Sequence, residues 1–340
     1  MSEAVGIHDH PDLKLGLRPN DPTKPRLRLG KYVRLDQLVP VVPTTDVAPS
    51  YSWPMDMNDQ WGDCVVAGGD HTLQAIYLQL TGSYTNMTEA QILADYQTQN
   101  PNFDPNSSTN GAGSNADGGM MIQQYLEYLV AQKRILGFAA IDPTNEAEIK
   151  AGIYLGLAII TGETLTVAQQ AQTNVGVWDY VAGSGDWGGH CTTWVGYPGS
   201  PDYDTCVTWG QLVQMTQAFI KRQVSEAWFV ITQAHIDNPT FRAGMDLASF
   251  AQDFTDITGQ QWGGWQPTPQ PSPTPPGPPP APTPPPSPEP PSPTPPGPSP
   301  TPPPTPGPPA PPIPDVHRGF GHWVRQCLRW AEEVWDYYVG

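Results

Sequence analysis

The chain has 340 residues, and its 16 Lys and Arg stand against 33 Asp and Glu, a formal net charge of −17. This acidity argues against a nucleic-acid-binding protein, because phosphate contacts require clustered cations. The N-terminus has no apolar segment typical of a signal peptide, and no stretch approaches the roughly 18 uninterrupted apolar residues of a membrane span. We therefore expect no nucleic-acid partner, no membrane span and synthesis in the cytoplasm.

The composition divides the chain into four parts. Residues 1–50 are rich in proline and predict an extended strap on the main domain. Residues 51–265 carry regular helix and strand patterns and predict one globular domain. Residues 266–314 are almost entirely Pro, Ser, Thr, Gly and Ala, a composition that predicts an extended polyproline linker. Residues 315–340 predict a short amphipathic helix.

The globular part begins with helices. Residues 64–82 have apolar side chains at helical spacing, with Asp63 as a suitable N-cap. Thr88 and Gln91 predict the capping box of a second helix, and "GGMMIQQYLEYLVAQK" at 118–133 predicts a third. One more helix is expected at 145–156.

The pattern then changes to short β-rich runs. These are "LAIITGE", "HCTTWVGY", "DTCVTWG" and "EAWFVIT". "DLASFAQDF", near the end of the globular part, predicts helical wrapping. A helical half followed by a strand half predicts an α+β fold of two packed lobes with a cleft between them.

The C-terminal segment "HRGFGHWVRQCLRWAEEVWDYYVG" has a broad aromatic face at helical spacing. Isolated helices of this length are marginal in water, so the apolar face is expected to need a partner. That partner is a second copy of the chain, the globular domain or a separate protein.

The four cysteines form no CxxC pair; they are Cys64, Cys191, Cys206 and Cys327. The sequence therefore predicts free thiols, no metal site and no cofactor. Cys64 falls in the first turn of a predicted helix, where backbone N–H groups and the helix dipole favour a thiolate. His190 begins a predicted strand after two glycines, so its side chain is expected to project into the cleft. A cysteine and a distant histidine form the pair that nucleophilic acyl transfer requires.

Four blocks in this order resemble the papain-like cysteine peptidase superfamily: "NDQWGDCVVA", "NADGG", "GGHCTTWVGY" and "VTWG". The "ND..GDC" variant with "TWG" resembles a branch found in bacterial and phage proteins. The resemblance implies a helical lobe and an antiparallel β lobe. It also implies that Cys64 is the nucleophile, that His190 is the general base and acid, and that Gly118 and Gly119 bind substrate.

The chain departs from the family pattern in three places. The family's oxyanion glutamine lies six residues before the cysteine, where this chain has Asn58, whereas Gln60 has the matching side chain. The family's histidine-orienting asparagine falls on Val207, leaving Thr208 or Asp204 as polar substitutes. Asp63 precedes the nucleophile where a neutral residue is common, and its negative charge disfavours a neighbouring thiolate.

The first functional hypothesis is a thiol hydrolase that cleaves a peptide or other amide bond without a cofactor. The second is a weakly active or inactive papain-like domain that serves as a tethered structural or interaction protein of a larger assembly, such as a phage virion. The linker and the C-terminal helix suit the second hypothesis, because fold does not imply function.

Overall fold

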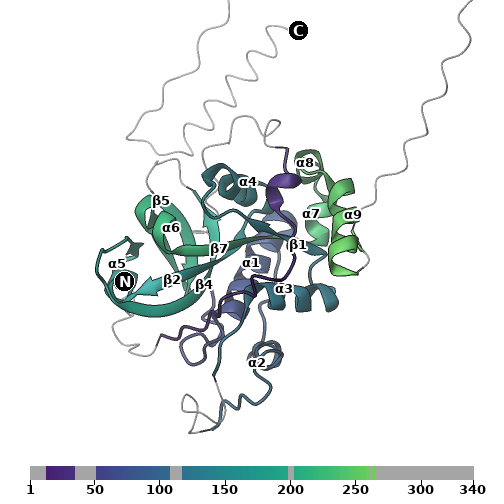
Figure 1. Ribbon diagram of the computed structural model, residues 1–340. Coiled ribbons are helices and arrows are strands. Elements are labelled where there is room, and N and C mark those ends of the chain that lie inside the picture. Colours follow the sequence, from purple (N-terminus) through teal and green to yellow (C-terminus); the bar gives the residue numbers. More distant parts are fainter. Residues whose placement is uncertain (1–12, 35–50, 108–116, 198–202, 261, 265–340) are drawn as a thin grey trace, which may run out of the picture. The chain divides into compact units, whose positions relative to one another are not determined.

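The computed structural model describes residues 13–34, 51–107, 117–197, 203–260 and 262–264, all within one compact unit, Met1–Ser272. The predicted linker at 266–314, the predicted helix at 315–340 and the ends of the predicted strap lie outside the described residues. Figure 1 shows the strands β2, β4 and β7 running together across the centre, with α2 below them and α7, α8 and α9 gathered to one side.

The first half of the domain is helical, as predicted. Its helices are α1 (Cys64–Thr81), α2 (Glu89–Gln97), α3 (Ile122–Ala131) and α4 (Glu146–Gly156), preceded by the 3-10 turn η2 (Leu29–Lys31). The capping box of Thr88 and Gln91 forms at the start of α2, and Gly82 ends α1 in the left-handed conformation with φ 77°. The third helix begins at Ile122, later than predicted, because Met120 pairs with Leu17 in a β-bridge.

The domain contains a seven-stranded sheet with the order β1-β7-β2-β4-β5-β6-β3, and every strand except β1 follows α4. The strands are β1 (Gly137–Ile141), β2 (Ile159–Thr166), β3 (Val177–Trp178), β4 (Asp186–Gly196), β5 (Tyr203–Thr208), β6 (Gln211–Thr216) and β7 (Val224–Ile231). Every pairing is antiparallel except β3 with β6. The four predicted runs correspond to β2, β4, β5 and β7, whereas the short β1 and β3 and the half-exposed β6 were not predicted.

Five further helices cover the sheet or follow it. They are α5 (Val167–Val175), α6 (Gln217–Gln223), α7 (Gln233–Asp237), α8 (Pro239–Gly244) and α9 (Leu247–Thr258). Helix α9 corresponds to the predicted wrapping helix, and it buries Leu247, Phe250 and Phe254 against the β-lobe core. The shorter helices were missed, because few residues carry their periodic pattern.

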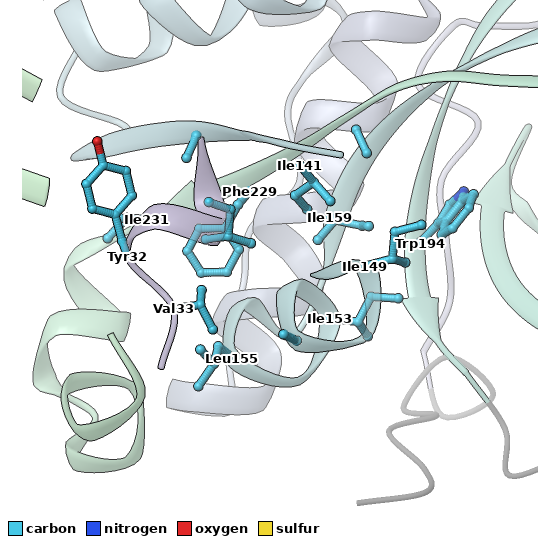
Figure 2. Close-up of a cluster of buried hydrophobic side chains, with 14 of the residues drawn as sticks. Tyr32, Val33, Ile141, Ile149, Ile153, Leu155, Ile159, Trp194, Phe229 and Ile231 are labelled. Atoms are coloured by element: carbon cyan, nitrogen blue, oxygen red, sulfur yellow. The ribbon is translucent and has the colours of Figure 1, made fainter. Parts of the chain in front are cut away.

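Two large clusters of buried side chains correspond to the two lobes. One contains Trp61, Cys64 and Tyr96 and joins the helical half to one face of the sheet. The other joins α4 and residues 27–33 to the sheet. Figure 2 shows Tyr32 and Val33 beside Phe229, with Ile149 and Ile153 facing the strands. Residues 27–33 are therefore part of the core, and the α+β prediction with two packed lobes is confirmed.

Candidate active site

Cys64 is the first residue of α1 and is fully buried. Asp63 is the N-cap residue of α1, as predicted, but its side chain makes no capping hydrogen bond. The Asp63 carboxyl instead accepts a hydrogen bond from Nδ2 of Asn58, at 3.2 Å. Burial raises the pKa of Asp63 well above its usual range. The negative charge that the sequence places beside the thiol is therefore disfavoured by burial.

The Cys64 thiol is held in its neutral form. Burial raises its pKa far above the ordinary cysteine value. The backbone N–H groups of Cys191 and Gly16 act in the opposite direction, because they hydrogen-bond to the sulfur, but desolvation outweighs them. Cys191 belongs to β4 and Gly16 to the N-terminal segment. The sulfur therefore lies between the first turn of α1, the strand that carries His190, and a segment from the start of the chain.

His190 lies in β4 and is also fully buried. Its ring stacks on Trp209, with centroids 4.0 Å apart and an angle of 17° between the planes, and Trp178 meets it edge-on at 6.4 Å. Nε2 is 2.7 Å from the hydroxyl oxygen of Thr208, while Nδ1 has no hydrogen-bond partner among the described residues. Burial lowers the pKa of His190 to about 3, so the imidazole is neutral with one nitrogen open to accept a proton.

Thr208 and Val207 point in different directions at the end of β5. Val207 occupies the position of the family's asparagine, and its side chain packs in a small apolar cluster with Trp53 and Val195. Thr208 points to His190, since successive residues of a strand face opposite sides. Asp204, the other polar candidate, is buried, and burial raises its pKa to about 6, but the hydrogen bond to His190 Nε2 comes from Thr208.

Replacing Thr208 by valine is expected to weaken any His190-dependent reaction by roughly tenfold, the equivalent of one hydrogen bond. Valine has nearly the same shape but cannot hold Nε2, so the ring loses its orientation and tautomer preference. The variant Thr208→Ser should retain the wild-type rate. The pH profile of Cys64 alkylation measures the change, and identical profiles for the valine and serine variants would contradict it.

The two candidate oxyanion amides lie in different environments. Asn58 is buried, and its Nδ2 donates to the backbone oxygen of Trp61 at 3.1 Å and reaches that of Lys14 at 3.5 Å. Gln60 is exposed to solvent. Asp56 and Met57, just before Asn58, adopt positive φ angles of 52° and 66°, which turn the chain sharply at this point. Asn58 is therefore the better-fixed amide.

Gly118 and Gly119 lie beside the N-terminal segment, defined here as residues 13–18. The Met120 N–H donates to the Gly16 carbonyl at 2.7 Å, and the Arg18 N–H donates to the Met120 carbonyl at 2.8 Å. On the other side, the Leu17 N–H donates to the carbonyl of Gly189, next to His190, at 3.0 Å. The segment is thus an extended peptide held between both lobes by backbone hydrogen bonds.

The same segment touches other candidate residues. The Trp209 indole N–H donates to the Lys14 carbonyl at 3.2 Å, and the Lys14 N–H donates to the Asn58 carbonyl at the same distance. With the Gly16 N–H directed at the Cys64 sulfur, residues 14–18 run past Asn58, Cys64 and Met120. The sequence predicts a strap on the domain, but it contains no signal that the strap covers these residues.

Comparison with solved structures shows which known folds the chain resembles. Xylellain, a cysteine protease from Xylella fastidiosa, aligns over 65% of this chain and 97% of its own, with a TM-score of 0.50 and 12% sequence identity. The fold is papain-like. Procathepsin B S9 from Trypanosoma congolense aligns at a TM-score of 0.41 and 11% identity, covering 65% of this chain and 86% of its own. A cysteine protease from Carica candamarcensis aligns at a TM-score of 0.38 and 12% identity, covering 56% of this chain and 98% of its own. No family model and no curated protein matches the sequence.

The papain-like fold contains several functional candidates that the sequence did not indicate. Asp117 accepts the Gly62 N–H with both carboxyl oxygens, at 2.9 and 3.0 Å. Tyr96 is buried and bonds the same carboxylate. Glu163 lies buried in β2 opposite His190. Two sequence features could have pointed to these residues. Glu163 is the one acidic residue in the predicted strand "LAIITGE", and Asp117 directly precedes Gly118.

Other features of the papain-like domain lie apart from these residues. A cavity of about 270 Å³ lies between residues 24–27, α3 and α9, and no candidate site residue lines it. In the described part of the chain, no group of three or more His, Cys, Asp or Glu side chains is arranged to hold a metal ion. The helices of that part are all too short or too polar to cross a membrane.

Proposed function

We propose that the chain is a papain-like thiol hydrolase that cleaves a peptide or other amide bond. The supporting observation is the N-terminal segment, an extended peptide hydrogen-bonded to both lobes with its Gly16 N–H at the Cys64 sulfur. A site that holds one peptide backbone in this way offers the same donors and acceptors to another. Met120 and Gly189 would then hydrogen-bond the substrate once the segment is displaced, and Gly118 and Gly119 would line its path.

The chemistry begins when His190 takes the thiol proton and the Cys64 thiolate attacks the carbonyl carbon. The backbone N–H of Cys64 and the amide of Asn58, or of Gln60 after rearrangement, hold the oxyanion. The imidazolium then gives its proton to the leaving amine. Water hydrolyses the thioester, with His190 again as base, and the second product leaves. Thr208 orients the imidazole throughout.

We expect slow hydrolysis as long as residues 13–18 cover the site. In it, burial raises the pKa of Cys64 and lowers that of His190, so both groups are neutral and the thiolate is scarce. Displacing residues 13–18 admits water to Cys64 and His190 and so removes the burial that shifts both pKa values. The segment therefore acts as a cover that holds the pair uncharged.

The test is turnover of a peptide library by the full-length chain, read by mass spectrometry. Cys64→Ala is expected to abolish cleavage, because no other thiol occupies the first turn of α1. Cys206→Ala removes a buried thiol from β5 and serves as the matched control. Cleavage at an equal rate in Cys64→Ala would refute the mechanism.

The second candidate is a tethered structural or interaction protein that belongs to a bacterial or phage branch of the papain-like superfamily. It would be incorporated into an assembly such as a virion. The observation that favours it is the complete burial of both Cys64 and His190. In this case peptides displace the segment and Cys64 reacts with iodoacetamide, yet no library member is cleaved. The predicted C-terminal helix would attach the domain to its protein partner or to a second copy.

A further inference from the structure

Three glycine backbones meet beside Cys64. A Cβ atom on Gly16 would lie 1.7 Å from the Gly62 carbonyl oxygen, and one on Gly119 would lie 2.0 Å from the Gly16 carbonyl oxygen. Real Cβ atoms do not approach backbone atoms this closely. Gly119 also has φ 68°, a conformation that favours glycine. We call the space between the Gly62 and Gly119 backbones, which Gly16 fills, the glycine slot.

The two walls of the glycine slot are tied together. Asp117 holds the Gly62 N–H with both carboxyl oxygens, at 2.9 and 3.0 Å. The Tyr96 hydroxyl donates to the same carboxylate and accepts the Gly119 N–H at 3.0 Å. Each wall is therefore bonded to the same carboxylate, one directly and the other through Tyr96. A wider slot requires breaking at least one of these bonds.

Tyr96 is itself fixed, so the tie is rigid. Its side chain is fully buried, and its ring packs edge-on against Phe103, with centroids 5.0 Å apart. Asn100 adds a second hold on the same wall, because its side chain accepts the Gly118 N–H at 3.2 Å and donates to the Gly119 carbonyl at 3.0 Å. Neither wall can give way without disturbing buried hydrogen bonds.

The residue after Gly16, Leu17, is half-buried and lies over the backbone of Gly162 in β2. A Cβ on Gly162 would lie 2.7 Å from Leu17 Cδ2 and equally close to Cγ of Glu226. The Leu17 side chain therefore lies against the bare backbone of β2 and the aliphatic part of Glu226. A peptide that follows the path of residues 14–18 places a residue without a side chain in the glycine slot and an aliphatic side chain at the next position.

We propose that the glycine slot makes the site selective for peptides that carry glycine beside Gly62 followed by an aliphatic residue. Gly16 and Leu17 satisfy this rule, which allows the N-terminal segment to cover Cys64. Selectivity for substrates rests on the proposed thiol hydrolase function. Selective binding of peptides does not require that any peptide be cleaved.

The first test measures how fast iodoacetamide alkylates Cys64 in the full-length chain, with peptide mapping by mass spectrometry. Gly16→Ala is expected to raise the rate at least roughly tenfold, because the added methyl group cannot fit and the segment leaves the slot. Gly185→Ala is the matched control, since the nearest atom to its added Cβ lies 4.0 Å away. Equal rates in folded Gly16→Ala and wild type would overturn the proposal.

The second test adds synthetic peptides and needs a host whose slot is empty. The variant Leu17→Asp is such a host. It places a carboxylate beside Glu226, so residues 13–18 leave the glycine slot while Gly62 and Gly119 stay unchanged. A peptide of residues 13–20 should protect Cys64 in this host. The same peptide with alanine for Gly16 should need at least about ten times the concentration. Equal protection by the two peptides would overturn the proposal, whether or not Gly16→Ala folds.

The third test asks whether Asp117 sets the slot width. In the Leu17→Asp host, Asp117→Ala should reduce the difference between the glycine and alanine peptides to about threefold or less. Asp104→Ala is the control, because Asp104 is exposed and its carboxyl accepts the Asn106 N–H of its own turn. Unchanged discrimination in Asp117→Ala would show that the tie does not limit the slot.

These outcomes separate the two proposals. Protection of Cys64 by the glycine peptide alone, without cleavage of any library peptide, refutes hydrolysis and retains the slot. Cleavage of glycine and alanine substrates at equal rates supports hydrolysis and refutes the slot.

Discussion

Replacing His190 by alanine is expected to lower the rate of peptide cleavage on the order of 10³-fold, the scale of a lost general base. The variant keeps the Cys64 thiol but removes the nitrogen that takes its proton in the proposed mechanism; His190 Nδ1 has no hydrogen-bond partner among the described residues. Cleavage is measured as kcat/KM with a peptide from the library. The loss should appear in kcat, because Met120 and Gly189, not His190, hydrogen-bond the backbone of the segment whose place the peptide is proposed to take.

The matched control is His235→Gln. His235 is a second buried histidine, at the start of α7, where its ring forms the capping box with Thr232. Glutamine suits this capping position, so the fold should be preserved. A loss of activity in His235→Gln equal to that in His190→Ala would indicate a general effect of removing a buried imidazole. Unchanged cleavage in His190→Ala would remove His190 from the mechanism.

Replacing Glu163 by glutamine is expected to stabilise the protein at pH 8 by about 3 kcal/mol while changing its stability little at pH 4.5. Glu163 is fully buried, and its Oε1 accepts from Thr161, Thr192 and Trp194 at 2.5, 3.0 and 3.3 Å. Its Oε2 has no hydrogen-bond partner among the described residues. Burial raises its pKa from 4.5 to about 7, and these hydrogen bonds only partly offset the shift.

The sign follows from proton binding. Between pH 4.5 and about 7 the folded state keeps the Glu163 proton that the unfolded state has released. The wild-type free energy of unfolding therefore falls as the pH rises through this window and levels off above it. Glutamine does not titrate, so urea unfolding at pH 4.5 and pH 8 measures the difference directly.

Glu146→Gln is the control for this experiment. Glu146 is exposed and pairs with Lys150, and that hydrogen bond lowers its pKa. Its loss should slightly destabilise the protein at pH 8, the opposite sign to Glu163→Gln. A Glu163→Gln variant with the same pH dependence as wild type would show that the Glu163 carboxyl stays charged in the fold.

The sequence allowed the α+β fold to be predicted because its strongest patterns belong to long or well-capped elements. Helix α1 has apolar spacing over its whole length, and Thr88 with Gln91 marks the start of α2. Strands β4 and β7 contain the β-branched and aromatic runs 192–195 and 228–231. Strand β3 has two residues and α7 has five, so neither carries enough of a period to be recognised.

The candidate site was harder to predict because it depends on which way side chains point. Spacing along the chain identifies Val207 with the family's asparagine, but the imidazole is met by the next residue, Thr208. The Asp63 side chain turns away from the helix end that its type predicts. The Gly62 N–H is held by Asp117, a residue distant in sequence, and no local pattern reveals such a contact.

The position of the N-terminal segment also bears on how the chain folds. Residues 13–18 are made early, yet their partners Met120, Gly189 and Trp209 arrive much later. Contacts so far apart in sequence must close a long loop, which is slow relative to forming the local turns of α1. The segment can dock only after both lobes have formed, so we expect every newly made chain to pass through a stage with an uncovered Cys64 thiol.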